Sequence, residues 1–157
     1  MGQSRDAFTL VELTMVMVII GVLAAVAVPR FMDDPMRLRS EGRLLLTHLR
    51  FAQQHALSQG VDVEVRFRSG IGYSVVTSAG DDVPDPLGGG ALIHRFAPSV
   101  QSVTTNLSSS RLVFDHRLGA PSDGSGALSG QRQIVLTSNS DSMTIRIHPN
   151  TGFAEVL

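Results

Sequence analysis

The residue whose chemistry stands out first is Glu12, because it lies inside the apolar run Phe8 to Val28. An ionisable side chain in hydrocarbon costs at least about 2.5 kcal/mol, so this carboxylate implies either a charged partner or a function. The run has roughly the twenty-residue length of a helix that crosses a bilayer. A short polar segment precedes it and Pro29 follows it. We therefore expect a membrane helix that carries one carboxylate with a specific task.

The histidines do not form a pattern typical of catalysis or metal binding. They are His48, His55, His94, His116 and His148. None belongs to an HExxH sequence or to another ligand pair at diagnostic spacing. His48 and His55 could share one helix face, but such pairs more often serve packing. Asp115 and His116 lie near several serines, yet no Gly-x-Ser-x-Gly elbow accompanies them. We expect no enzyme activity, no cofactor and no metal.

The densest acidic cluster consists of Asp81, Asp82 and Asp85. Oxygen ligands in a loop could bind calcium, but no EF-hand spacing is present, so a solvated loop is the favoured interpretation and calcium binding stays open. The formal net charge of −1 gives no global basic field for nucleic acid. The absence of cysteine excludes disulfides and thiolate metal sites.

One long helix is expected from about residue 8 to residue 58. Beyond Pro29 the apolar residues recur at helical spacing, at Leu38, Leu45, Leu49, Ala52 and Ala56. Pro29 and Pro35 are expected to kink or interrupt this helix without ending its course. Gly60 is the natural stop.

After Gly60 the apolar period changes to two, which predicts strands. The predicted strands cover residues 61–67, 73–77, 91–96, 100–104, 112–114, 133–137, 143–148 and 153–156. A turn is expected at 69–72, loops at 79–90 and 119–130, and a hairpin turn at 150–152. The second loop is long for a compact domain and is expected to be mobile. Strands without intervening helices predict antiparallel sheets, and with the helix they give an α+β fold.

The segment Phe8-Thr9-Leu10-Val11-Glu12-Leu13 resembles the class III signal of type IV pilins and type II secretion pseudopilins. In that family a prepilin peptidase cuts before the phenylalanine and methylates the new amino terminus. The resemblance implies cleavage between Ala7 and Phe8, methylation of Phe8 and an assembly role for Glu12. The residue before the cut is usually glycine, and Ala7 is the smallest side-chain substitute.

In the family, the glutamate pairs with the charged amine of a neighbouring subunit inside the filament. Two opposite charges about 4 Å apart in a low dielectric attract strongly, while either charge alone is heavily penalised. Glu12 matches that position, so one axial offset between helices would satisfy both charges.

The layout after the signal is similar to the GspH/FimT group of minor pilins and pseudopilins, with its long helix, Gly-rich insertions and terminal I-x-I-x-P-x-T-G hairpin. The junction Pro29-Arg30-Phe31 is similar to minor pilins of MSHA-type systems. The implied division is a prepilin leader at 1–7, a transmembrane and assembly helix at 8–29, its amphipathic continuation at 30–59, and a periplasmic β-rich domain at 60–157.

The resemblance implies a minor pilin or pseudopilin that helps to initiate or modulate assembly of a type II secretion pseudopilus or a type IV (MSHA-like) pilus. Its partners would be the prepilin peptidase, other pilins or pseudopilins, and the bacterial inner membrane, with the C-terminal domain in the periplasm. Gly21 and the alanines near it would allow close helix approach.

Three alternatives remain open. One is a membrane-anchored periplasmic binding domain that never polymerises, and another is a major structural subunit. The third is a FimT-like subunit for DNA uptake, which needs exposed basic residues to neutralise phosphates. In those relatives they lie near the C-terminus, but residues 151–157 contain none, and Arg132 and Arg146 are isolated. Binding of nucleic acid is therefore not expected.

Overall fold

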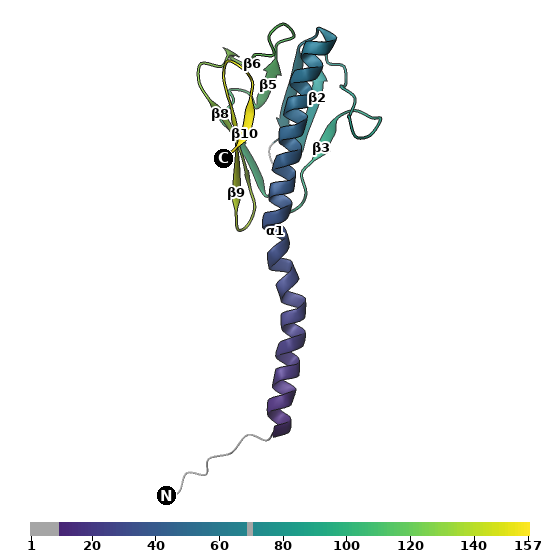
Figure 1. Ribbon diagram of the computed structural model, residues 1–157, viewed down its shortest axis with the longest axis vertical. Helices are drawn as coiled ribbons and strands as arrows, with labels where there is room; N and C mark the ends of the chain where they lie inside the picture. Colours follow the sequence, from purple (N-terminus) through teal and green to yellow (C-terminus); the bar gives the residue numbers. More distant parts are fainter. Residues whose placement is uncertain (1–9, 69–70) are drawn as a thin grey trace, which may run out of the picture. The chain divides into compact units, whose positions relative to one another are not determined.

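The computed structural model describes residues 10–68 and 71–157, except for the side chains of residues 25–34. The chain forms two compact units, Met1–Asp33 and Asp34–Leu157. Helix α1, Leu10–Gln59, contributes to both (Figure 1). Its extent confirms the single long helix expected from the sequence.

Helix α1 is helical throughout, including at Pro29 and Pro35. The helix is therefore not interrupted at these prolines, and the expectation that it continues past them is confirmed. Each proline removes one backbone hydrogen bond, and the turns on either side retain theirs. The helix ends as predicted at Gly60, which adopts a φ of 68° and donates its N–H to the carbonyl of Ala56 at 3.0 Å. A left-handed residue at this position favours glycine because it has no Cβ.

The second unit contains two antiparallel sheets. The first sheet has the strand order β3 (Ile93–Arg95), β2 (Gly72–Thr77), β1 (Val63–Arg68), β5 (Arg111–Phe114), β6 (Pro121–Asp123) and β7 (Gly126–Ala127). The second sheet has the order β10 (Ala154–Val156), β9 (Ser142–Ile147), β8 (Arg132–Thr137) and β4 (Ser102–Thr105). Every predicted strand is present, with ends that differ by one or two residues.

The stretch 119–130 differs from the expected long loop, because β6 and β7 form within it and extend the first sheet. The buried carboxylate of Asp123 explains the order of this segment. It accepts hydrogen bonds from the hydroxyl of Ser108 at 3.0 Å and from the backbone N–H of Ser125 at 2.9 Å, and it pairs with Arg132 at 3.4 Å. The sequence did not predict these strands, because one acidic residue in a Gly/Ser-rich stretch does not form a strand pattern.

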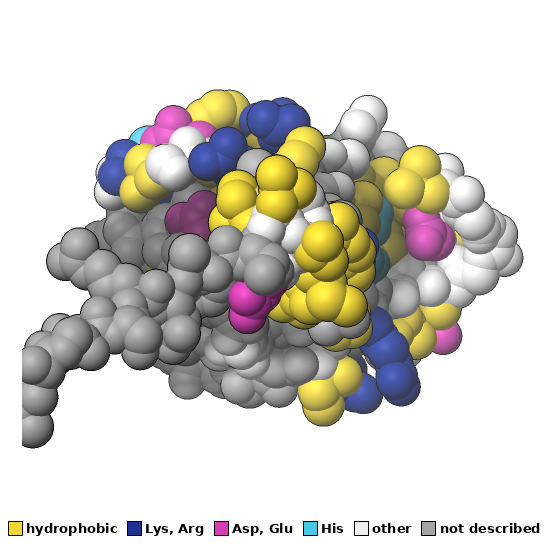
Figure 2. Space-filling model, turned by 90° about the horizontal axis from the view of Figure 1, so that it is seen from below, with side chains coloured by type: hydrophobic (Ala, Val, Ile, Leu, Met, Phe, Trp, Pro, Cys, Tyr) yellow, Lys and Arg dark blue, Asp and Glu magenta, His cyan; other side chains and the backbone are white. Residues whose placement is uncertain are grey.

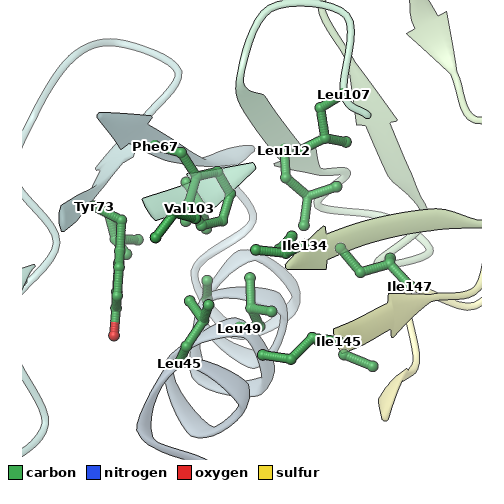
Figure 3. Close-up of a cluster of buried hydrophobic side chains, with 14 of the residues drawn as sticks. Leu45, Leu49, Phe67, Tyr73, Val103, Leu107, Leu112, Ile134, Ile145 and Ile147 are labelled. Atoms are coloured by element: carbon green, nitrogen blue, oxygen red, sulfur yellow. The ribbon is translucent and has the colours of Figure 1, made fainter. Parts of the chain in front are cut away.

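The core lies where residues 34–59 of α1 pack against both sheets (Figure 1). The predicted helix face is buried: Leu38, Leu45, Leu49, Ala52 and Ala56. In Figure 3, Leu45 and Leu49 lie among Leu112 of the first sheet and Ile134 and Ile145 of the second. Burial of each large aliphatic side chain stabilises the fold by about 1.5–3 kcal/mol. The α+β fold with a helix on antiparallel sheets is thereby confirmed.

Candidate assembly site

The first described part of α1, residues 10–24, is exposed at every position. Its large hydrophobic side chains are between 47% and 78% exposed. Figure 2, a view from below, shows exposed hydrophobic side chains grouped near its centre. They are Leu10, Val11, Leu13, Met15, Val16, Met17, Val18, Ile19, Ile20, Val22 and Leu23. A helix that is hydrophobic on all sides is stable where lipid or protein covers it. We therefore expect lipid or another protein chain to cover this segment.

Glu12 is the acidic residue in the first turn of α1, and it is exposed. A negative charge near a helix N-terminus is favourable, because the helix dipole is positive there. Ala7 and Phe8, the predicted cleavage and methylation residues, lie outside the described residues. The cleavage, the methylation and the pairing of Glu12 thus stay predictions.

Within the described part of the chain, no helical stretch has both the length and the mean hydropathy expected of a membrane-spanning helix.

A polar cluster, buried at His48 and Tyr73 and half-buried at Glu41 and His94, joins α1 to the first sheet. His48, 3% exposed, hydrogen-bonds through Nδ1 to the hydroxyl of Tyr73 at 2.7 Å. His94 Nε2 meets a carboxylate oxygen of Glu41 at 2.7 Å, and the Glu41 carboxylate also accepts the N–H of Ala97 at 3.3 Å. The His48 and His94 ring centroids are 6.2 Å apart.

Burial in this cluster shifts the pKa values of His48 and Tyr73. Burial lowers the pKa of His48, with a smaller opposing effect from the charge of Asp85. Burial also raises the pKa of Tyr73, and the charges of Glu41 and Asp85 act in the same direction. These shifts favour the neutral forms of the His48 and Tyr73 rings, whose hydrogen bond joins the helix to the sheet. The sequence did not indicate this cluster, because Glu41 and His94 are far apart in the chain.

The other candidate histidines have separate surroundings. His55 packs against the ring of Phe51, with centroids 5.6 Å apart, and His148 contacts the carboxylate of Glu155 at 3.1 Å. His48 and His55, considered together in the sequence, therefore have different partners.

Asp115 and His116 are joined by a third residue that the sequence did not indicate. His116 donates its backbone N–H to Asp62 at 2.9 Å, and its Nδ1 lies 2.6 Å from the same carboxylate oxygen. Asp62, Asp115 and His116 are close enough to hold a metal ion. Asp115 already accepts the N–H groups of Arg117 and Leu118, both at 2.9 Å, and these bonds lower its pKa. The contacts hold a turn, and no serine hydroxyl in the described part of the chain hydrogen-bonds to these side chains.

The acidic loop does not form a comparable cluster within the described residues. Asp82 forms an isolated bridge with Val76, and Asp85 accepts the N–H of Leu87 at 2.8 Å. The two basic residues weighed for DNA binding both lie in ion pairs. Arg132 contacts Asp123 at 3.4 Å, and Arg146 contacts Glu155 at 3.4 Å.

A long helix that is exposed and apolar in its first part and packed on antiparallel sheets in its second part defines a pilin-like subunit. The model of the prokaryotic N-terminal methylation motif matches residues 3–28, and that of the type II transport protein GspH matches residues 41–151. The chain belongs to the GspH family, whose members are structural subunits of the pilin and pseudopilin kind.

Two solved structures of the type IV minor pilin FimU from Pseudomonas aeruginosa strain PAO1, in different crystal forms, share the fold. Both have a TM-score of 0.54 and cover 76% of this chain. The sequence identities are 19% and 18%, and 87% and 92% of the FimU chains are covered. At this identity the likeness shows the fold alone. No curated protein matches the sequence significantly.

Proposed function

We propose that this chain is a non-enzymatic minor subunit that helps to initiate or modulate assembly of a type II secretion pseudopilus or a type IV pilus. A prepilin peptidase cuts it between Ala7 and Phe8 and methylates Phe8. Before assembly it resides in the bacterial inner membrane with its C-terminal domain in the periplasm. The observation that carries this proposal is the exposed apolar helix of residues 10–24 with Glu12 in its first turn.

Glu12 acts as a register device in this proposal. Its carboxylate pairs with the methylated amine of a neighbouring Phe8 once the two helices pack together and exclude water. Removing one partner of a buried ion pair costs about 3–5 kcal/mol, because the other charge stays buried without compensation. A penalty of that size lowers the affinity of one subunit for the next by more than about a hundredfold.

The first experiment measures processing. The full chain is expressed with and without an active prepilin peptidase, and its intact mass and N-terminal residue are determined. A mature form that begins at methylated Phe8 is the expected result. A chain that still begins at Met1, while a control substrate is cut, would favour a static membrane anchor.

The second experiment measures incorporation of Glu12→Ala into sheared filaments or pseudopili, relative to the wild-type chain. Asp81→Ala is the matched control, because it removes an exposed carboxylate from the globular unit. We expect normal membrane levels for both variants and a loss of incorporation for Glu12→Ala only. Normal incorporation of Glu12→Ala would refute the pairing mechanism. It would not affect the conclusion about cleavage and methylation at Phe8.

A further inference from the structure

The outer face of the first sheet carries an arginine-rich surface that the assembly role does not explain. Along β1 the side chains alternate: Val63, Val65 and Phe67 are buried in the core, and Arg66 and Arg68 are exposed on the opposite face. This alternation follows from the two-residue period of a strand. The exposed face of β1 therefore belongs to the surface of the second unit.

Strand register adds further arginines to this face. Arg66 lies opposite Arg111 of β5, and Arg68 and Arg95 lie on either side of Gly72 in the row formed by β1, β2 and β3. Residues paired across antiparallel strands share a face. The register thus gathers four guanidinium groups that are distant in the sequence.

Arg66 and Arg111 share one carboxylate, that of Glu64. Glu64 contacts Arg66 at 2.9 Å and Arg111 at 3.3 Å, and its side chain is only 8% exposed. The hydrogen bond from Arg66 is the main cause that lowers the pKa of Glu64. Among the described residues, neither Arg68 nor Arg95 forms an ion pair. The row of Arg68, Gly72 and Arg95 therefore carries two guanidinium groups that have no ion-pair partner among the described residues.

A hollow of about 280 Å³ lies at this row, lined by Arg68, Gly72 and Arg95 together with Ile71 and Ile93. A Cβ at position 72 would lie 2.0 Å from the backbone carbonyl oxygen of His94, so the close approach of β2 and β3 requires glycine. The two isoleucines are 55% and 62% exposed, which gives the hollow an apolar border.

We propose that this hollow, the Arg68–Arg95 site, binds an acidic and partly apolar segment of a partner protein. A carboxylate of that segment accepts hydrogen bonds from the two guanidinium groups, whose planar forks match carboxylate geometry. A neighbouring apolar side chain of the segment covers Ile71 and Ile93.

Charge and size favour a protein segment over a long polyanion. Asp82 also lines the hollow, and its carboxylate interrupts the basic surface there. The successive phosphates of a nucleic acid need a continuous basic track. A short segment with one or two carboxylates needs only the two guanidinium groups. The site belongs to the folded second unit and does not depend on filament entry.

The test uses the full chain in a zwitterionic detergent with nitrogen-15 in its arginine side chains. The probe is a capped pentapeptide with two aspartates around a leucine, and its matched control carries asparagines instead. A single-stranded oligonucleotide is the third probe. Binding is followed through the arginine Nε–H resonances.

Arg68→Gln combined with Arg95→Gln is the test variant. Arg39→Gln combined with Arg43→Gln removes the same charge from exposed positions on α1 and serves as its control. We expect the acidic peptide to shift the Arg68 and Arg95 resonances and the test variant to bind at least about tenfold more weakly. Arg95→Lys keeps the charge and loses the planar fork, so its affinity for the peptide should lie between those of the wild-type chain and the test variant.

Three outcomes would overturn the proposal. They are no binding of the acidic peptide to the wild-type chain, equal binding of the asparagine peptide, and tighter binding of the oligonucleotide at the same two arginines. An equal loss in the control variant would show that net charge, and not this site, attracts the peptide.

Discussion

The contact between His48 and Tyr73 supports a quantitative prediction for the anchoring of α1. Tyr73→Phe removes one oxygen atom and leaves the ring in place. Within the described structure, Nε2 of His48 is buried without a hydrogen-bond partner, so the Tyr73 hydroxyl is the partner on which the imidazole depends. Leaving a buried polar group unsatisfied costs about 1–3 kcal/mol. We expect Tyr73→Phe to reduce the free energy of unfolding by that amount.

The assay is urea unfolding of the full chain in a non-ionic detergent, followed by circular dichroism. With a slope of about 1–3 kcal/mol per molar urea, the midpoint should fall by about 1 M. The same substitution is then made in a His48→Leu background, where the hydroxyl has lost its partner. There Tyr73→Phe should be neutral or stabilising. An equal cost in both backgrounds would refute the hydrogen bond as the source of the effect.

The remaining predictions concern pH, a buried carboxylate and two glycines. Burial lowers the pKa of His48, so the unfolded chain binds a proton more readily than the folded chain does. The free energy of unfolding should therefore fall as the pH drops below about 6.5, and it should fall less in His48→Leu. The same pH dependence of the urea midpoint in both proteins would contradict this. Asp123→Asn should cost about 3 kcal/mol at neutral pH. Hydrogen bonds from Ser125 lower the pKa of Asp123, so this contribution should begin to decline below about pH 3.9 and shrink further as the pH falls toward the lower pKa of the folded state. A cost of Asp123→Asn that is as large in acid as at neutral pH would count against this. Gly60→Ala should lower stability by about 1–2 kcal/mol, because alanine is strained at a φ of 68°. No further cost from a clash is expected, since nothing lies within 4 Å of the added Cβ. Gly152→Ala should cost more in the same assay, because its Cβ would also lie 2.9 Å from the carbonyl oxygen of Gly119; equal costs would refute the packing argument.

Local patterns in the sequence determined the elements. The spacing of Leu38, Leu45 and Leu49 predicted the buried helix face, and Gly60 predicted its end, because both depend on residues within one or two helical turns. The N-terminal hexapeptide and the terminal hairpin indicated the family, since they are contiguous motifs. Two short strands around Asp123 were missed, because their order depends on a carboxylate whose partners lie on three separate segments.

Tertiary structure alone decided which distant residues meet. The pairing of β1 with β5 places Arg66 opposite Arg111, and the β3–β2–β1 register places Arg68 and Arg95 on either side of Gly72. The contact between Glu41 and His94 likewise joins α1 to β3. A period of two fixes which residues of a strand share a face, but it does not fix which strands become neighbours or in what register. That choice depends on packing of the whole core, so both the polar anchor and the Arg68–Arg95 site become visible only in the folded chain.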